Sequence, residues 1–173
     1  MISLINTNIH KKVLDLGCGE GVFLPTLSSI YNDVDAVDID VRTAIEIKKH
    51  YKLKNVNIFC DNILNTNLLD NSYDLIIAAS FLEHFNDLNI VLNVIKKILN
   101  KGGTFVFSIP NENILYKIGK YVTGYQKYDH KIHQHYLSKT EIFMKVNHKL
   151  KFISKRAVPS LILPLHTCYL FKN

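Results

Sequence analysis

The stretch VLDLGCGEGVFL, residues 13–24, most constrains the fold, because three glycines at alternate positions directly follow a short apolar run. The run before the glycines has the length and composition of a buried strand, and apolar residues then resume with a different period. A glycine-rich turn from a strand into a helix lets the main chain approach a ligand closely, since no side chain stands in the way. This order of elements is typical of an open parallel sheet, whose ligands bind beyond the carboxyl ends of the strands.

Strand and helix patterns alternate from residue 11 to residue 109. Strands are predicted at 11–18, 34–39, 55–60, 73–80 and 104–109, and helices at about 20–30, 41–51 and 88–101. Pro25 lies one turn into the first helix and is expected to delay or kink its start. Asn86 or Asp87 is expected to cap the third helix, and Gly102 and Gly103 to end it. Such alternation specifies a parallel sheet with right-handed crossovers.

The end of the chain breaks this alternation. Two apolar runs, at 149–158 and 161–173, are joined by a segment too short for a helix, so they are expected to pair as an antiparallel hairpin. No repeat, low-complexity tract or linker interrupts the 173 residues. The sequence therefore predicts a single α/β domain, 1–173, with a Rossmann-like, doubly wound, mostly parallel sheet of seven strands and an antiparallel C-terminal hairpin.

Composition narrows the class of protein. A hydrophobic fraction of 47% and a charged fraction of 21% are those of a folded globular chain. Cys18, Cys60 and Cys168 are odd in number and lack paired spacing, which argues against a disulfide framework or a zinc site and favours a reducing compartment. The N-terminus carries no signal-peptide pattern, and no apolar stretch approaches the roughly 20 residues of a membrane span. We therefore expect a cytoplasmic protein without a membrane span.

The net charge of +6 raises nucleic acid as a partner. The lysines, however, are scattered as pairs along the predicted helix faces and ends. The chain has two arginines, Arg42 and Arg156, and arginine is the usual residue for bidentate contacts to phosphate or guanine. Nucleic acid is thus the less favoured kind of partner.

The residues around the glycines indicate the kind of cofactor. Asp38 lies nineteen positions beyond Gly19, at the end of the second strand, where a carboxylate can accept two hydrogen bonds from a ribose diol. The dinucleotide fingerprint needs a glycine where this chain has Val22. Asp15 would repel a pyrophosphate but suits the ammonium of an amino acid. The sequence thus indicates a cofactor that carries a ribose and an α-amino acid. The alternative is that the glycines form a tight turn and serve packing alone.

A strand followed by Asp15, Gly17, Gly19 and Gly21 resembles the signature of the class I S-adenosylmethionine-dependent methyltransferases, in their small-molecule branch. The resemblance covers about residues 12–171. It implies that these residues bind S-adenosylmethionine, with S-adenosylhomocysteine as the product. Transfer is then an in-line displacement, to which the protein contributes mainly alignment and exclusion of water.

The same resemblance assigns further cofactor contacts. It implies that Asp38 holds the ribose and that Ile39 packs on the adenine. In the segment CDNI, residues 60–63, it implies that Asp61 takes the adenine amino group while the Asn62 backbone faces the ring nitrogen.

The segment SFLEHF, residues 80–85, is similar to the segment after strand four in quinone and biotin-precursor methylases. The resemblance implies that Ser80 lines the methionine end of the cofactor. His84 is a candidate for a catalytic base, with a structural histidine, which the branch often carries here, as the alternative. A base is needed only if the acceptor must lose a proton. Glu83 is expected to point outward or to stand at a helix start.

Residues 111–148 are rich in tyrosine and histidine and are predicted to form a lid over the acceptor, with a helix near 114–122. His133 is a second candidate for a catalytic base. His133 and His135 would share one face of a strand and could bind a metal, but no fourth ligand accompanies them, so a polar loop is favoured and no metal is predicted.

The expected acceptor is a small molecule, a saccharide or a lipid. The alternatives are an RNA methyltransferase and a non-catalytic S-adenosylmethionine-binding partner subunit. Few residues precede the first strand, so closure of the substrate side would fall to 111–148 or to a second subunit, for example in a homodimer.

Overall fold

The computed structural model describes residues 1, 4–5, 11–65, 68, 72–111, 136–159 and 164–173. In this part of the chain seven strands form one sheet in the order β3-β2-β1-β4-β5-β7-β6. The strands are β1 (Lys12–Leu16), β2 (Asp33–Asp38), β3 (Val56–Cys60), β4 (Tyr73–Ala79), β5 (Leu99–Pro110), β6 (Lys151–Val158) and β7 (His166–Lys172). Neighbours from β3 to β5 pair in parallel, and β7 runs antiparallel to both β5 and β6. The predicted fold class is confirmed.

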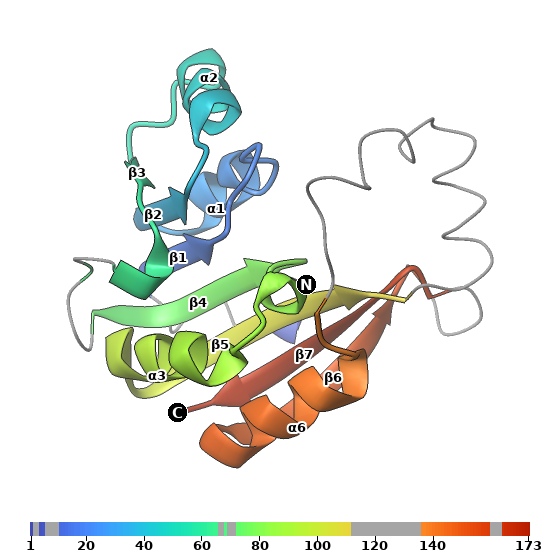
Figure 1. Ribbon diagram of the computed structural model, residues 1–173. Helices are drawn as coiled ribbons and strands as arrows, with labels where there is room; N and C mark the ends of the chain where they lie inside the picture. The colour runs from blue at the N-terminus through green and yellow to red at the C-terminus, as the bar shows by residue number, and fades with distance from the viewer. Residues whose placement is uncertain (2–3, 6–10, 66–67, 69–71, 112–135, 160–163) are drawn as a thin grey trace.

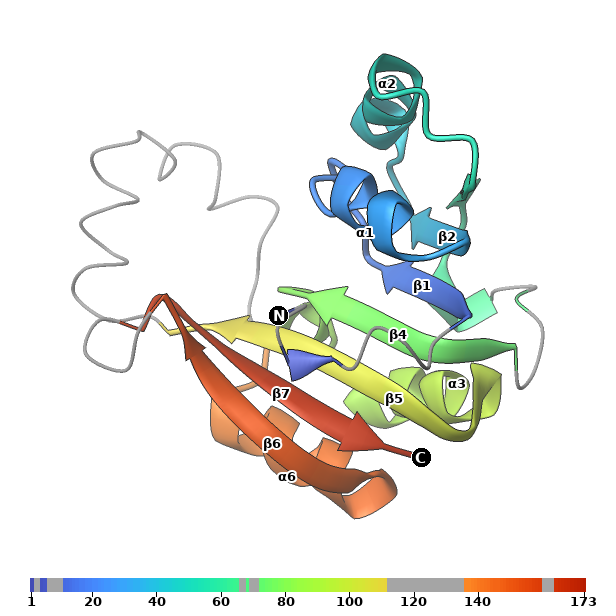
Figure 2. The same cartoon turned by 180° about the vertical axis from the view of Figure 1, so that it is seen from behind.

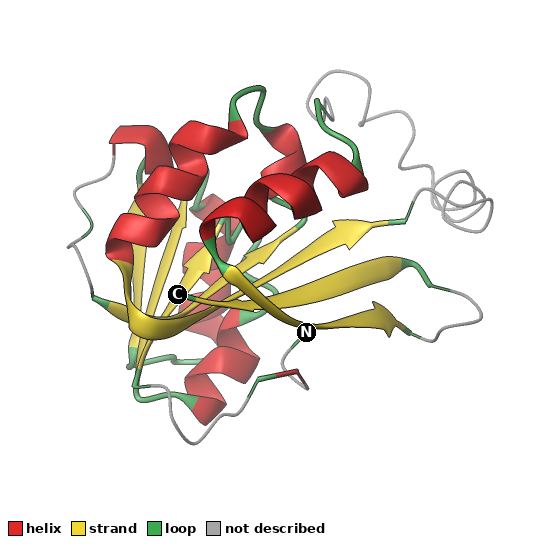
Figure 3. Cartoon of the chain, turned by 90° about the horizontal axis from the view of Figure 1, so that it is seen from below, coloured by secondary structure: helices red, strands yellow, loops and turns green. Residues whose placement is uncertain are grey.

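Helices cover both faces of this sheet (Figures 1 and 3). The helices are α1 (Leu24–Ile30), α2 (Arg42–His50), α3 (Leu88–Ile98) and α6 (Lys139–Lys149), with short 3-10 turns η3 (Ile63–Asn65) and η4 (Leu82–His84). Helices α1 and α2 lie beside β1, β2 and β3, whereas α3 and α6 cover the opposite face at β4, β5 and β7 (Figures 1 and 2). None of the helices in the described ranges is long and apolar enough to cross a membrane.

The central strands are apolar on both sides because both of their faces are covered. Alternate residues of β4 enter different cores: Leu75 and Ile77 pack on the α1 side, while Ile76 and Ala78 pack on the α3 side. This arrangement explains the continuous apolar run of β4, in which periodicity alone could not distinguish two buried faces from one.

Helix α1 begins later than its apolar pattern. Pro25 stands in the first turn, where its missing N–H has no intrahelical partner to lose, and the helix begins at Leu24. The predicted delay is confirmed. As a result, residues 17–23 are left as a turn between β1 and α1.

Helix α3 ends earlier than predicted. Asp87 caps its start by accepting from Asn89 N at 2.9 Å, as expected. The prediction that Gly102 and Gly103 end the helix is wrong, because α3 ends at Ile98 and β5 follows at once. Leu99 is fully buried and pairs with Tyr73, so tertiary packing draws it into the sheet. Regular pairing resumes only at Thr104, after an irregular stretch.

Helix α6 was not predicted, although its start carries a clear sequence signal. The Ser138 side chain accepts from Glu141 N, and the Glu141 side chain accepts from Ser138 N, which together form a capping box. Ile142 and Val146 are the buried residues of this helix. The helix predicted near 114–122 lies outside the described residues.

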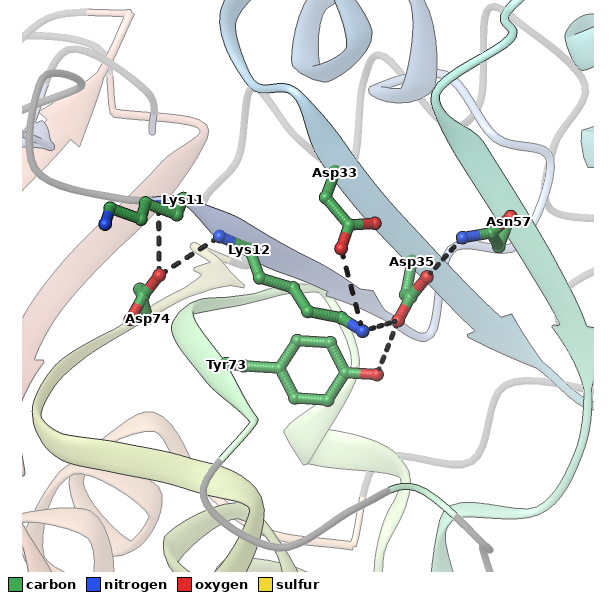
Figure 4. Close-up of polar contacts among 7 residues, drawn as sticks. All are labelled: Lys11, Lys12, Asp33, Asp35, Asn57, Tyr73 and Asp74. Carbon is green, nitrogen blue, oxygen red and sulfur yellow. Dashed lines mark hydrogen bonds and ion pairs between the residues drawn. The ribbon is translucent and has the colours of Figure 1, made fainter.

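A polar network ties the amino ends of four strands together (Figure 4). Asp35 of β2 is 3% exposed and accepts from Tyr73 Oη at 2.8 Å and from Asn57 Nδ2 at 2.9 Å. Lys12 Nζ lies 3.2 Å from Asp35 Oδ2. Asp74 accepts from the backbone N–H of Lys12 at 3.1 Å. The network holds strands β1, β2, β3 and β4 together at their amino ends. Their carboxyl ends are therefore kept in register around the glycine-rich turn.

Candidate functional site

A cleft of about 740 Å³ opens at the carboxyl ends of the strands. It lies where the chain order of the sheet reverses between β1 and β4, which is where ligands bind in open α/β sheets. Its lining comes from residues 16–20, 22–23, 37–40, 43, 61–64, 79–81 and 84–85. The volume is that of a small-molecule site.

The glycine-rich turn forms one wall of the cleft. Gly17, Gly19 and Gly21 all have positive φ, at 72°, 49° and 79°. A Cβ on Gly17 would lie 2.1 Å from the Phe81 ring, and one on Gly21 would lie 2.9 Å from the Ala44 backbone. A Cβ on Gly19 would meet nothing within 4 Å. Packing thus accounts for two of the glycines, whereas Gly19 leaves open space beside the main chain, as a ligand-binding turn requires.

Asp38 connects the end of β2 to this turn. Its Oδ2 accepts from Gly19 N at 2.8 Å, and its Oδ1 accepts from Asp40 N at 3.1 Å. A carboxylate offers about four acceptor positions, so two are left for a ligand. Because Asp38 also lines the cleft, it can hold the glycine turn and accept from a diol at the same time.

The predicted adenine contacts gather at the next strand ends. Ile39 is 75% exposed and lines the cleft, which is unusual for a large aliphatic side chain. Asp61 Oδ1 accepts from Asn62 N at 2.8 Å, and Asn62 Oδ1 accepts from Leu64 N at 3.0 Å at the start of η3. The Asn62 N–H is therefore engaged, and contact with a ring nitrogen would require it to exchange this bond.

Asp15 lies behind the cleft wall. It is 1% exposed, and its Oδ2 has no hydrogen-bond partner in the described part of the chain. Burial, followed by the nearby charge of Asp38, raises the pKa of Asp15 to about 7. Burial and these two carboxylates also raise the pKa of the Cys18 thiol to about 12, so this thiol is not reactive. Of the described site residues, Asp15 and Gly21 stand behind the lining rather than in it.

The cleft is acidic although the chain is basic. Four carboxylates line it, from Glu20, Asp38, Asp40 and Asp61, and the described lining includes no lysine or arginine. Arg42 stands outside the lining, and its bidentate hydrogen bonds lower the pKa of Asp40 to about 2. This balance favours a ligand with positive charge and disfavours one that carries phosphates.

The segment after β4 closes the cleft at its other end. Ser80 has a φ of 48°, a conformation uncommon outside glycine, and its N–H donates to Ser108 O at 3.0 Å. The rings of Phe81 and Phe85 meet edge to face at 4.8 Å, and both line the cleft. His84, a predicted candidate base, also lines it.

Glu83 was expected to point outward or to stand at a helix start. It does lie in the first turn of η4, which begins at Leu82, but it is 1% exposed, so the outward orientation is wrong. The turn lies between β5 and α6, which cover it. The Glu83 carbonyl accepts from Tyr136 N at 2.9 Å, a contact that sequence reasoning did not anticipate.

His133, His135 and most of the predicted lid, residues 112–135, lie outside the described residues. At the flanks of this segment, Asn111 Oδ1 accepts from Lys139 Nζ at 2.7 Å and from Thr167 Oγ1 at 3.0 Å. Within the described ranges, no group of three or more His, Cys, Asp or Glu side chains could hold a metal ion.

Comparisons with known proteins place this geometry in context. A family model described as a methyltransferase domain matches residues 14–107. An uncharacterised protein of Methanocaldococcus jannaschii is 35% identical over 120 residues, which are 67% of this chain and 50% of that protein. A ubiquinone biosynthesis O-methyltransferase of Paraburkholderia phymatum is 27% identical over 116 residues, 64% of this chain and 50% of that enzyme. The chain thus spans about half the length of these two relatives.

Solved structures show the same fold. The crystal structure of the N-methyltransferase NodS from Bradyrhizobium japonicum, in complex with S-adenosyl-L-homocysteine, aligns with a TM-score of 0.73 at 16% identity. The alignment covers 95% of this chain and 78% of that one. At this identity the likeness concerns the fold alone.

Proposed function

This chain belongs to the methyltransferase domain family, and from that membership we propose that it is an S-adenosylmethionine-dependent methyltransferase acting on a small-molecule, saccharide or lipid-type acceptor. The observation that carries the proposal is the acidic cleft beside Gly19 in a chain of net charge +6. S-adenosylmethionine is a sulfonium that also bears an ammonium group, and it lacks phosphates. Its charge therefore matches this cleft, whereas that of a dinucleotide does not.

The described residues fit this cofactor. Asp38 keeps acceptor capacity for the two ribose hydroxyls, and the exposed Ile39 side chain offers an apolar surface for the adenine. Asp61 directly follows the neighbouring strand β3 and lines the cleft, so it would hold the adenine amino group. Asp15 has an oxygen without a partner in the described part of the chain, and above its pKa of about 7 its negative charge attracts a cationic ligand through the cleft wall.

The chemistry needs little from the protein beyond alignment. The bound cofactor supplies a methyl group already activated by the sulfonium. Phe81 and Phe85 form an apolar wall at the β4 end of the cleft and exclude water from it. Ser80 and the η4 turn fix the wall in place, so the acceptor can be held in line with the methyl group. His84 lines the cleft and would take a proton if the acceptor loses one.

Titration calorimetry tests the proposal. S-adenosylmethionine and S-adenosylhomocysteine should bind, and NAD should bind at least about 100-fold more weakly. Comparable affinity for NAD would overturn the assignment. Methyl transfer measured with quinol, saccharide and lipid acceptors then distinguishes between the acceptor classes.

Two alternatives concern the acceptor and the partner. An RNA acceptor is favoured by the net charge of +6 alone. A non-catalytic subunit would bind the cofactor with the same residues, and cofactor binding without turnover would identify it. A homodimer would also bind the cofactor with these residues, and light scattering would identify the dimer. The closure of residues 111–148 over the acceptor stays a prediction.

A further inference from the structure

Helix α2 and strand β3 stand together at one edge of the sheet (Figure 1). Residues of α2, of the turn after it and of β3 line a second hollow, of about 580 Å³. Ile45, Leu53 and Ile58 supply its apolar lining, and Lys48, Lys49, Lys52 and Lys54 supply its charge. We call it the lysine pocket. It shares no described lining residue with the acidic cleft, so the proposed methyl transfer does not account for it.

The positive charge of the lysine pocket is largely unneutralised. Lys49 pairs with Glu46 at 3.1 Å. Lys48, Lys52 and Lys54 form no ion pair within the described ranges. Lysines in the last helical turn can serve the helix dipole, which accounts for Lys48 and Lys49. Lys52 and Lys54 follow the helix, so the dipole does not account for them.

The backbone holds these lysines in a defined turn. Leu53 N donates to Lys48 O at 3.0 Å, and Lys52 N donates to Lys49 O at 3.2 Å. Lys52 has a φ of 52°, a left-handed conformation that glycine or asparagine commonly supplies after the end of a helix. A lysine in this conformation is less stable than a glycine would be. Its charged side chain is the feature that a glycine could not supply.

We propose that the lysine pocket binds an acidic protein segment that carries a large apolar side chain. The apolar side chain enters between Ile45, Leu53 and Ile58, and flanking carboxylates pair with Lys52 and Lys54. A phosphate alone would leave the apolar floor unused. Nucleic acid is less suited, because neither arginine nor an aromatic ring is among the described lining residues, and these are the groups that grip phosphates and stack on bases.

Fluorescence anisotropy of a short labelled peptide, with glutamates around a central Leu-Phe pair, tests this proposal. The Lys52→Gln/Lys54→Gln variant should bind the peptide about tenfold more weakly than the parent chain. The matched control, Lys96→Gln/Lys101→Gln, removes the same charge from exposed positions outside the pocket and should change affinity less than about twofold. S-adenosylhomocysteine binding should be unchanged in both variants, which shows that each is folded.

A third variant separates an acidic peptide from other anions. Ile45→Gln keeps every lysine but makes the floor polar, and it should weaken peptide binding by about fivefold. Equal loss in the Lys96→Gln/Lys101→Gln control, or equal binding of a peptide of glutamates alone, would overturn the proposal. Tighter binding of a labelled oligouridylate that ignores Ile45→Gln would replace it with a nucleic-acid site.

Discussion

The Asp15→Asn variant should be more stable than the parent chain at alkaline pH, although it removes a residue of the glycine motif. Asp15 is 1% exposed and its Oδ2 has no partner in the described part of the chain. Burial and the Asp38 charge raise its pKa from 3.8 to about 7. At about 1.4 kcal/mol for each pH unit, the ionised carboxylate costs the folded state up to about 4 kcal/mol.

The sign follows from proton linkage. A pKa that is higher in the folded state means that the folded chain binds more protons between pH 4 and 7 than the unfolded chain does. The Asp15 contribution to stability is therefore complete below its unfolded pKa of 3.8 and is lost as the pH rises toward 7. Asparagine imitates the protonated carboxyl at every pH, so the variant escapes this loss.

Urea unfolding at several pH values measures the effect. Near pH 4 the variant and the parent should have similar free energies of unfolding, and at pH 8 the variant should be more stable by about 2–4 kcal/mol. The matched control is Asp35→Asn, because Asp35 is also buried but accepts from Tyr73 and Asn57 and pairs with Lys12. This control should destabilise the chain by about 1–3 kcal/mol at pH 8.

The two readouts of Asp15→Asn should move in opposite directions. The variant should bind S-adenosylhomocysteine more weakly, because the cleft loses a negative charge behind its wall, while its stability rises. Equal unfolding midpoints for parent and variant at pH 8, or a difference that does not change with pH, would refute the reasoning about this carboxylate.

Three further predictions concern residues in the cleft. Asp38→Ala should weaken S-adenosylhomocysteine binding in calorimetry by roughly 10- to 100-fold, and Asp61→Ala by less; parent-like affinity would remove Asp38 from the site. Gly17→Ala should cost at least about 1–2 kcal/mol in thermal unfolding, because the new methyl group meets the Phe81 ring at positive φ, and adding Phe81→Ala should not worsen it. His84→Gln should flatten the pH profile of kcat if this side chain takes a proton; an unchanged profile would assign it a structural role.

The positions of the strands could be predicted because each strand has a local signal. In β4 the continuous apolar run reflects two buried faces, and in the 13–24 stretch the glycines mark the turn itself. The end of α3 could not be predicted, since Leu99 has helical spacing relative to Leu92 and Ile95 and enters the sheet only because Tyr73 offers a partner. Local pattern and tertiary pairing compete there, and pairing prevails.

The positions of the site residues along the strand ends could be predicted from the sequence, but their burial could not. Asp38 could be placed from the number of residues that separate it from Gly19, because this separation puts it at the end of the second strand. Residue spacing says nothing about depth, however. Asp15 stands behind the cleft wall, and Glu83 is buried although its sequence context is that of a solvated turn. Both depths depend on elements distant in sequence, such as α6 over η4.

Net charge is the clearest case in which a whole-chain property misleads about a site. The total of +6 favours anionic partners, yet the residues that line the main cleft carry four carboxylates and, as described, no lysine or arginine. The topology sorts the charges: acidic residues stand at the carboxyl ends of β2 and β3, and lysines gather where α2 ends. A basic surface repels a sulfonium at long range, but that repulsion is screened beyond about 8–10 Å at physiological salt. Inside the cleft the carboxylates determine the sign of the electrostatic potential. The charge of the ligand must therefore be inferred from the residues that line the cleft and not from the net charge of the chain.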